Sequence, residues 1–167
     1  MAADVLASMG TGLEPPRSAR ESGTTPWHLR LAPDELAVRL PGVVAAEAAA
    51  VGEGKLAVLV PPGRAEELAG LLGPELAAAT ARQGPAVLDA RVAVLTVAEA
   101  KGLEFDAVVV ADPAAILATG GHGANDLYVA LTRATASLGG VHPAELPAVL
   151  ARLADAQFAG PPAGDGR

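Results

Sequence analysis

Two short apolar runs decide the fold: residues 92–97 (VAVLTV) and residues 107–111 (AVVVA), with a polar loop between them. Each run is rich in valine, shows no polar alternation and is too short for a stable helix, which is typical of a strand buried on both faces of a parallel sheet. Residues 55–60 (KLAVLV), between Gly54 and Pro61, have the same character. These three runs predict the centre of a parallel sheet.

Helical patterns separate these runs. We expect a helix that opens at Pro33-Asp34-Glu35, is interrupted near Pro41-Gly42 and ends at Val51, since acids favour the first helical turn. The other expected elements are helices over 64–72, 125–137 (capped by Asn125-Asp126) and 143–153, and strands over 27–31 and 138–141. Strands that alternate with helices predict an α/β fold of about five parallel strands with helices on both faces.

The chain has room for one compact domain. It has 167 residues, of which 51% are hydrophobic and 19% charged, and it contains no internal repeat. We assign residues 27–155 to the domain, residues 1–26 to a lead-in segment with a short helix at 4–9 and a loop, and residues 156–167 to a flexible tail.

Composition excludes several functional classes. The net charge of −7 is opposite to that of an autonomous nucleic-acid binder, and an aromatic content of 2% leaves few rings for base stacking. The absence of cysteine excludes disulfides, zinc–thiolate sites and thiol catalysis, and it favours a cytoplasmic protein. The apolar runs are far shorter than the roughly 20 residues that span a membrane, and Asp4 stands where a signal peptide carries a basic residue.

The loop after residues 92–97 is the first candidate site, because ligands of open α/β sheets bind at the carboxyl ends of strands. In this loop Gly102 allows the backbone to approach a ligand, Glu104 can accept hydrogen bonds from sugar hydroxyls, and Lys101 offers a cation. The alternative is a polar loop whose Lys and Glu are merely solvated.

Residues 127–134 (LYVALTRA) are the second candidate. Arg133 in an apolar helical stretch is costly unless its guanidinium meets an anion or a carboxylate, and we expect Tyr128 to be buried beside it. Alternatively, Arg133 reaches the surface or pairs structurally with Glu104 or Asp106.

Together these two segments resemble motifs V and VI of the superfamily 1 helicases of the UvrD, Rep and PcrA type. The family pattern is Thr, four residues, then Lys-Gly-Leu-Glu-Phe after a strand, followed some twenty residues later by Tyr-Val-x-x-Thr-Arg-Ala. Residues 96–105 and 128–134 contain both parts in this order. The resemblance implies the second RecA-like domain of a two-domain ATP motor, with a fold like that of the P-loop NTPases but without the P-loop.

The resemblance also implies roles for individual residues. Arg133 would be the arginine finger that neutralises charge on the γ-phosphate of ATP, and Gly102, Glu104 and Lys101 would belong to the same nucleotide site. Thr96 and Thr132 would lie at the nucleic-acid backbone, DNA in these helicases.

The P-loop that should complete such a site is missing from this sequence. Gly52-Glu53-Gly54-Lys55 has two glycines and a lysine, but Leu56 follows where Ser or Thr should hold magnesium. We therefore expect half of an ATP site, with an N-terminal P-loop ATPase domain as partner and source of Mg²⁺, and no appreciable hydrolysis by this chain alone.

Two departures from the family pattern point to the HelD-like branch, which is associated with RNA polymerase. Ala98 replaces a histidine that faces single-stranded DNA, and Pro61-Pro62 follows the strand where the family often has Arg or Gln. The segments 99–106 (EAKGLEFD) and 15–23 (PPRSARESG) also resemble that branch.

Two other functions stay open: a non-catalytic interaction module that docks on RNA polymerase or another complex, and an unrelated nucleotide-binding Rossmann-like domain, against which the missing GxGxxG counts. The histidines predict no metal site, and we expect all three on the surface or in loops: His28, His122 and His142.

Overall fold

A seven-stranded parallel sheet forms the centre of the computed structural model, which describes residues 25–151 and 153–155. The strands follow the order β3-β4-β2-β5-β6-β1-β7. Their bounds are β1 (Trp27–Arg30), β2 (Leu56–Val60), β3 (Ala79–Thr80), β4 (Val92–Thr96), β5 (Phe105–Ala111), β6 (Ala134–His142) and β7 (Ala154–Asp155). The predicted α/β class with a parallel sheet is confirmed.

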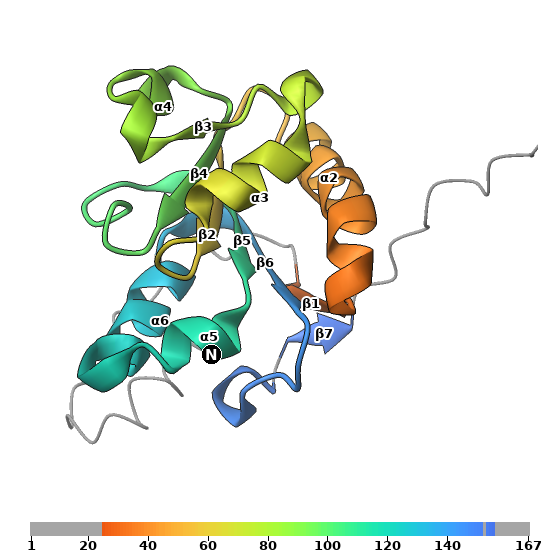
Figure 1. The fold of residues 1–167 in the computed structure, drawn as a ribbon, viewed down its shortest axis with the longest axis vertical. Coiled ribbons are helices and arrows are strands. Elements are labelled where there is room, and N and C mark those ends of the chain that lie inside the picture. Colours follow the sequence, from red (N-terminus) through yellow and green to blue (C-terminus); the bar gives the residue numbers. More distant parts are fainter. Residues whose placement is uncertain (1–24, 152, 156–167) are drawn as a thin grey trace, which may run out of the picture.

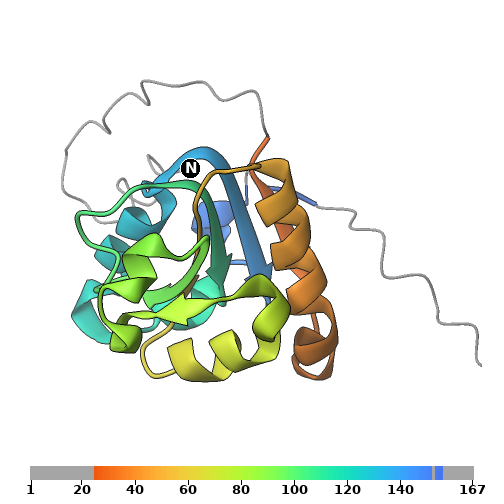
Figure 2. The same ribbon diagram turned by 90° about the horizontal axis from the view of Figure 1, so that it is seen from above.

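Helices cover both faces of this sheet (Figure 1 and Figure 2). One face packs against α2 (Pro33–Ala50) and α3 (Ala65–Leu72), and the other packs mainly against α5 (Pro113–Leu117) and α6 (Gly123–Leu131). The remaining helical elements are α4 (Ala86–Asp89) and four short 3₁₀ turns at Pro74–Leu76, Ala81–Gln83, Gly120–His122 and Ala148–Leu150. The described domain therefore has two apolar cores, one on each side of the sheet.

The three runs that predicted the sheet are its central strands. Within β2 every side chain is buried, because Val58 belongs to the core under α2 and Leu59 to the core on the opposite face. A strand with helices on both sides has no solvent-facing positions. The continuous apolar run is explained by this two-sided burial.

Helix α2 is not interrupted at Pro41, contrary to the prediction. Proline removes the hydrogen bond to the carbonyl of Ala37, but Ala37 is exposed, so its carbonyl has access to water. Leu40 and Val44, on either side of the proline, are fully buried in the same core. Packing along this face holds the two halves of the helix together.

The helix that carries the second candidate segment ends earlier than we expected. Helix α6 starts at Gly123, two residues before the predicted cap, and ends at Leu131, so Arg133 follows the helix and residues 134–137 open β6. Strand β6 pairs with β5 on one side and β1 on the other. Residues 134–137 pair with β5, and this ladder satisfies their backbone groups in place of a longer α6, so tertiary pairing overrides the helical pattern.

The predicted last helix, 143–153, is also wrong. Only Ala148–Leu150 forms a 3₁₀ turn, and β7 follows. Pro147 lacks an N–H group and disfavours helical geometry at the residue before it, and here, unlike at Pro41 in α2, no continuous helix forms. Strands β3 and β7, of two residues each, account for the difference between five predicted and seven observed strands.

Two of the three histidines lie in strands rather than on the surface or in loops. His142, at the end of β6, is buried, and its Nε2 lies 3.0 Å from Nδ1 of the half-buried His28 in β1. Nδ1 of His142 lies 2.7 Å from the carbonyl oxygen of Ala144. Only His122 is exposed as expected.

A buried polar cluster ties α2 to the sheet. The carboxylate of Glu47 accepts hydrogen bonds from Trp27 Nε1 (3.0 Å) and Ser137 Oγ (2.8 Å). The indole of Trp27 lies over Gly139 in β6, where a Cβ atom would stand 2.1 Å from a ring carbon. The absence of a side chain at Gly139 thus leaves space for the indole ring of Trp27, which donates to Glu47 in α2.

The predicted helix at 4–9, the segment 15–23 and the tail 156–167 lie outside the described residues. The boundaries of the proposed domain stay a prediction. Among the described residues, no helix combines the length and apolar character needed to cross a membrane.

Gly139→Ala is expected to lower the free energy of unfolding by about 2 kcal/mol, because the added methyl group must displace Trp27 or the strand. Gly140→Ala is the matched control, since its Cβ would meet its nearest neighbours at 3.8 Å. Urea unfolding of both variants measures the difference. Equal stability of the two variants would contradict this packing.

Candidate functional site

The parallel pairing of β5 with β6 brings the two candidate segments together. Phe105 and Ala134, the first residues of the two strands, are paired in register, so Glu104 and Arg133 precede neighbouring strands. The N–H of Phe105 donates to the carbonyl of Arg133 (2.9 Å), and Nη1 of Arg133 donates to the carbonyl of Leu103 (3.1 Å). The arginine is thereby fixed against the end of the loop.

Arg133 is half-buried and has no carboxylate partner among the described residues. Asp106, one of the expected partners, accepts instead from the backbone N–H of Lys55 (2.8 Å), and no ion pair joins Arg133 to Glu104. Nε of Arg133 is buried and lacks a hydrogen-bond partner in the described part of the chain. Tyr128 is half-buried rather than buried.

The loop that follows β4 crosses one face of the sheet. It leaves the carboxyl end of β4 and returns to the amino end of β5, anchored by Ala100, which is fully buried in the core beside α6. Gly102 has φ = +82°, which favours glycine. The ammonium of Lys101 lies 3.8 Å from the carboxylate of Asp126 in the first turn of α6.

This path divides the predicted site between two edges. Glu104 and Arg133 lie at the amino-terminal edge of the sheet, whereas Thr96 lies at the carboxyl edge. The expectation that the whole loop sits at the carboxyl ends of strands is therefore wrong. Strands β4 and β5 are parallel and lie on either side of β2. A loop that joins the end of β4 to the start of β5 must therefore cross from the carboxyl edge of the sheet to its amino edge.

The structure does not bring Thr96 and Thr132 together. Thr132 caps the carboxyl end of α6, where its hydroxyl donates to the carbonyl of Val129 (2.9 Å), directly beside Arg133. Thr96 lies near the opposite end of the same helix, in a pocket with Asp126.

A small pocket adjoins Glu104 at the amino edge. It has a volume of about 100 Å³ and is lined mainly by apolar side chains from α4, β4 and the loop, with Lys55 and Glu104 as its charged members. The ammonium of Lys55 donates to the carbonyl of Leu88. Glu104 is exposed, so its carboxylate is available to a ligand.

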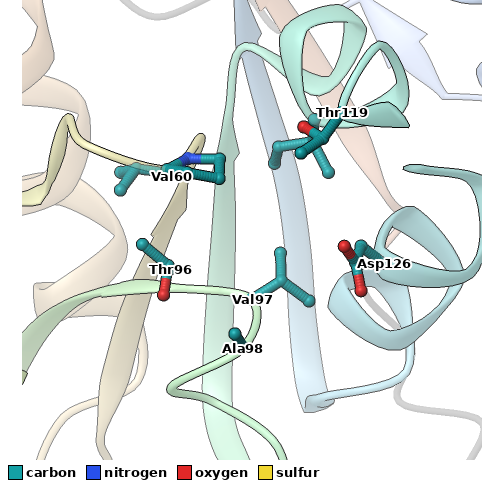
Figure 3. A pocket seen from close by; sticks show the side chains of 8 residues that line it. Val60, Thr96, Val97, Ala98, Thr119 and Asp126 are labelled. Carbon is teal, nitrogen blue, oxygen red and sulfur yellow. The ribbon is translucent and has the colours of Figure 1, made fainter. Parts of the chain in front are cut away.

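A second pocket, of about 130 Å³, lies at the carboxyl edge. Figure 3 shows Thr96 on one side of it, Asp126 and Thr119 on the other, and Val97 between them. Its other walls include Val60 and Ala98.

Sequence reasoning missed the role of Glu99 at this edge. The carboxylate of Glu99 accepts from the N–H (2.8 Å) and the hydroxyl (2.7 Å) of Thr96. The spacing Thr-x-x-Glu is a known local hydrogen-bonding pattern and was the available signal. Nearby, Arg64 donates two hydrogen bonds to Glu67, which lower the pKa of that carboxyl and raise the pKa of the arginine.

Comparison with known proteins places these segments in a family. Residues 91–139 match the UvrD-like helicase C-terminal domain. The match contains both motif segments, 96–105 and 128–134, and confirms the resemblance to the superfamily 1 helicases. No curated protein sequence matches the chain.

Solved structures share the fold of this chain. The C-terminal domain of a possible DNA helicase from Lactobacillus plantarum is 23% identical, with a TM-score of 0.63 over 78% of this chain and 81% of the other. The SWI2/SNF2 ATPase core of Sulfolobus solfataricus, solved in complex with double-stranded DNA, is 13% identical, with a TM-score of 0.57 over 77% of this chain. The match spans 31% of that ATPase core. The described residues of this chain contain no cluster of three or more potential metal ligands.

Glu99→Ala is expected to speed hydrogen exchange at the Thr96 amide about tenfold, because that N–H loses a charged acceptor. Glu104→Ala, in the same loop, is the control, since Glu104 makes no hydrogen bond to Thr96. Exchange followed by NMR makes the comparison. An unchanged Thr96 amide in Glu99→Ala would show that Glu99 does not hold the loop.

Proposed function

We propose that this chain is the second RecA-like domain of a superfamily 1 helicase-like ATPase and supplies half of an ATP site. The observation that carries the proposal is the position of Arg133, fixed beside the segment from Gly102 to Glu104 with a buried, unpartnered Nε. A buried guanidinium N–H without an acceptor is costly unless a ligand satisfies it.

The residues at the amino edge fit a nucleotide. Arg133 carries donors for phosphate oxygens, and its planar guanidinium suits bidentate contact with them. The exposed Glu104 can accept from ribose hydroxyls, and Gly102 leaves space for close approach of the backbone. Lys101 belongs to the same loop, where Asp126 offsets part of its charge. No carboxylate of this edge is placed on Arg133 to compete with a phosphate.

Bound ATP would supply the phosphoanhydride to be cleaved, and Mg²⁺ would come with a P-loop domain. The task of this chain is then electrostatic. The guanidinium of Arg133 donates to the carbonyl of Leu103, and the carbonyl of Arg133 accepts from the N–H of Phe105. Held in this way, Arg133 presents a fixed positive charge to the transferred phosphoryl group. Alone, the chain lacks the P-loop and is expected not to hydrolyse ATP.

We propose that Thr96 and its loop report closure of this site to a polymer or protein partner. The loop touches Arg133 at Leu103 and α6 at Lys101, so it links the two edges. The motor resemblance makes nucleic acid one candidate, with Thr96 and Thr132 as contacts.

A second candidate is an interaction module of the HelD-like type, docked on RNA polymerase. One observation favours it: the hydroxyl and N–H of Thr96 already donate to Glu99, so a nucleic-acid phosphate would have to displace a carboxylate.

Arg133→Ala is expected to reduce ATP turnover about 10³-fold or more while leaving ATP affinity within a few-fold, because an arginine finger acts mainly in the transition state. Steady-state turnover and equilibrium ATP binding are measured with this chain joined to its P-loop ATPase domain.

Arg82→Ala is the matched control, since Arg82 is exposed and pairs only with Glu66. Its turnover should equal that of the unmodified protein. Unchanged turnover in Arg133→Ala would refute the finger assignment, and ATP turnover that is absent from the unmodified pair would leave the interaction module as the better account.

A further inference from the structure

The polar side chains that line the pocket at the carboxyl edge offer a ligand only hydrogen-bond acceptors, and we propose that the pocket binds the side chain of an arginine or lysine from a protein partner. Its apolar walls would hold the aliphatic stem, and Asp126 would meet the cationic head (Figure 3). This proposal does not depend on ATP binding at the opposite edge.

Each hydroxyl that lines the pocket already donates its proton within the chain. The hydroxyl of Thr96 donates to Glu99, and the hydroxyl of Thr119 donates to the carbonyl of Ala115 (3.0 Å). Asp126 contributes a carboxylate, and Glu99 adds another on the far side of Thr96. A ligand that fits must therefore donate to these side chains, and ammonium and guanidinium groups only donate and also carry the positive charge that suits Asp126.

Of the described cationic side chains near the pocket, Arg64 is held by another group and Lys101 can be displaced from Asp126. Arg64, which follows Pro62 at the pocket, is held by Glu67 through two hydrogen bonds. The ammonium of Lys101 lies 3.8 Å from the carboxylate of Asp126, and more than half of the lysine side chain is exposed. Such a surface ion pair is weak. An incoming cation can therefore take the place of Lys101 at Asp126 at little cost.

A phosphate is disfavoured at the same place. The N-termini of helices commonly bind phosphate, but Asp126 already occupies the first turn of α6. At the start of α5, the carboxylate of Asp112 accepts from the N–H of Ala115 (3.1 Å). A carboxylate thus already takes the anion position at α5, and the charge of Asp126 repels an anion at α6.

The test is an NMR titration of this chain with n-butylguanidinium, which has the shape and charge of an arginine side chain. N-butylurea, a neutral analogue, and a ten-residue oligo-dT are titrated in parallel. We expect saturable shifts at Val60, Thr119 and Asp126 with n-butylguanidinium only. Asp126→Asn should weaken this binding about fivefold, whereas Asp89→Asn, which removes the same charge from exposed α4, should leave it within twofold.

Thr119→Lys gives a second, independent readout, because it places an ammonium group at the pocket itself. This variant should no longer bind the probe while keeping the remaining amide spectrum. Shifts at these three residues with oligo-dT, equal binding of N-butylurea, or no saturable shift with n-butylguanidinium would each overturn the proposal.

Discussion

The parallel pairing of β5 with β6 is the constraint on which the candidate site depends. Because both strands run in the same direction from paired first residues, the residues just before them must lie side by side. Those residues are Glu104 and Arg133. The bond from the Phe105 N–H to the Arg133 carbonyl is the first link between the two segments. Two motifs that lie far apart in the sequence thus become one surface through ordinary sheet geometry.

The same geometry gives the domain two working edges. The loop after β4 begins at the pocket with Thr96 and ends beside Arg133, and α6 runs alongside it from Asp126 to Thr132. A nucleotide at one edge and a macromolecular partner at the other would therefore be joined by two continuous elements. The charges at the two edges differ as well: Arg133, which has no carboxylate partner among the described residues, lies at the first, whereas the carboxylates of Asp126 and Glu99 lie at the second.

Much of the fold could be predicted because the burial of a strand determines where its sequence must be apolar. The runs in β2, β4 and β5 are apolar throughout since both faces of these strands are covered. The start of β6 could not be predicted, because residues 125–137 show a helical pattern and only the ladder to β5 ends the helix. The pairing of His28 with His142 joins positions 114 residues apart and depends on the strand order.

For the site, the resemblance predicted that Gly102, Glu104 and Arg133 belong together, and the structure brings their segments into contact. The division between two edges was missed, since the sequence does not say which way a loop crosses a sheet. Glu99 had no role in the sequence-based hypothesis, and its bond to Thr96 depends on the turn that the loop forms.

The central claim is that Arg133 completes a nucleotide site supplied by a second domain. The most direct test is the NMR signal of the Arg133 Nε–H group, observed while the P-loop ATPase domain and ADP with aluminium fluoride are added. The account predicts a large shift and slower exchange of this proton only when both are present, because its missing acceptor is then supplied. A signal that does not respond to the complete mixture would contradict the account.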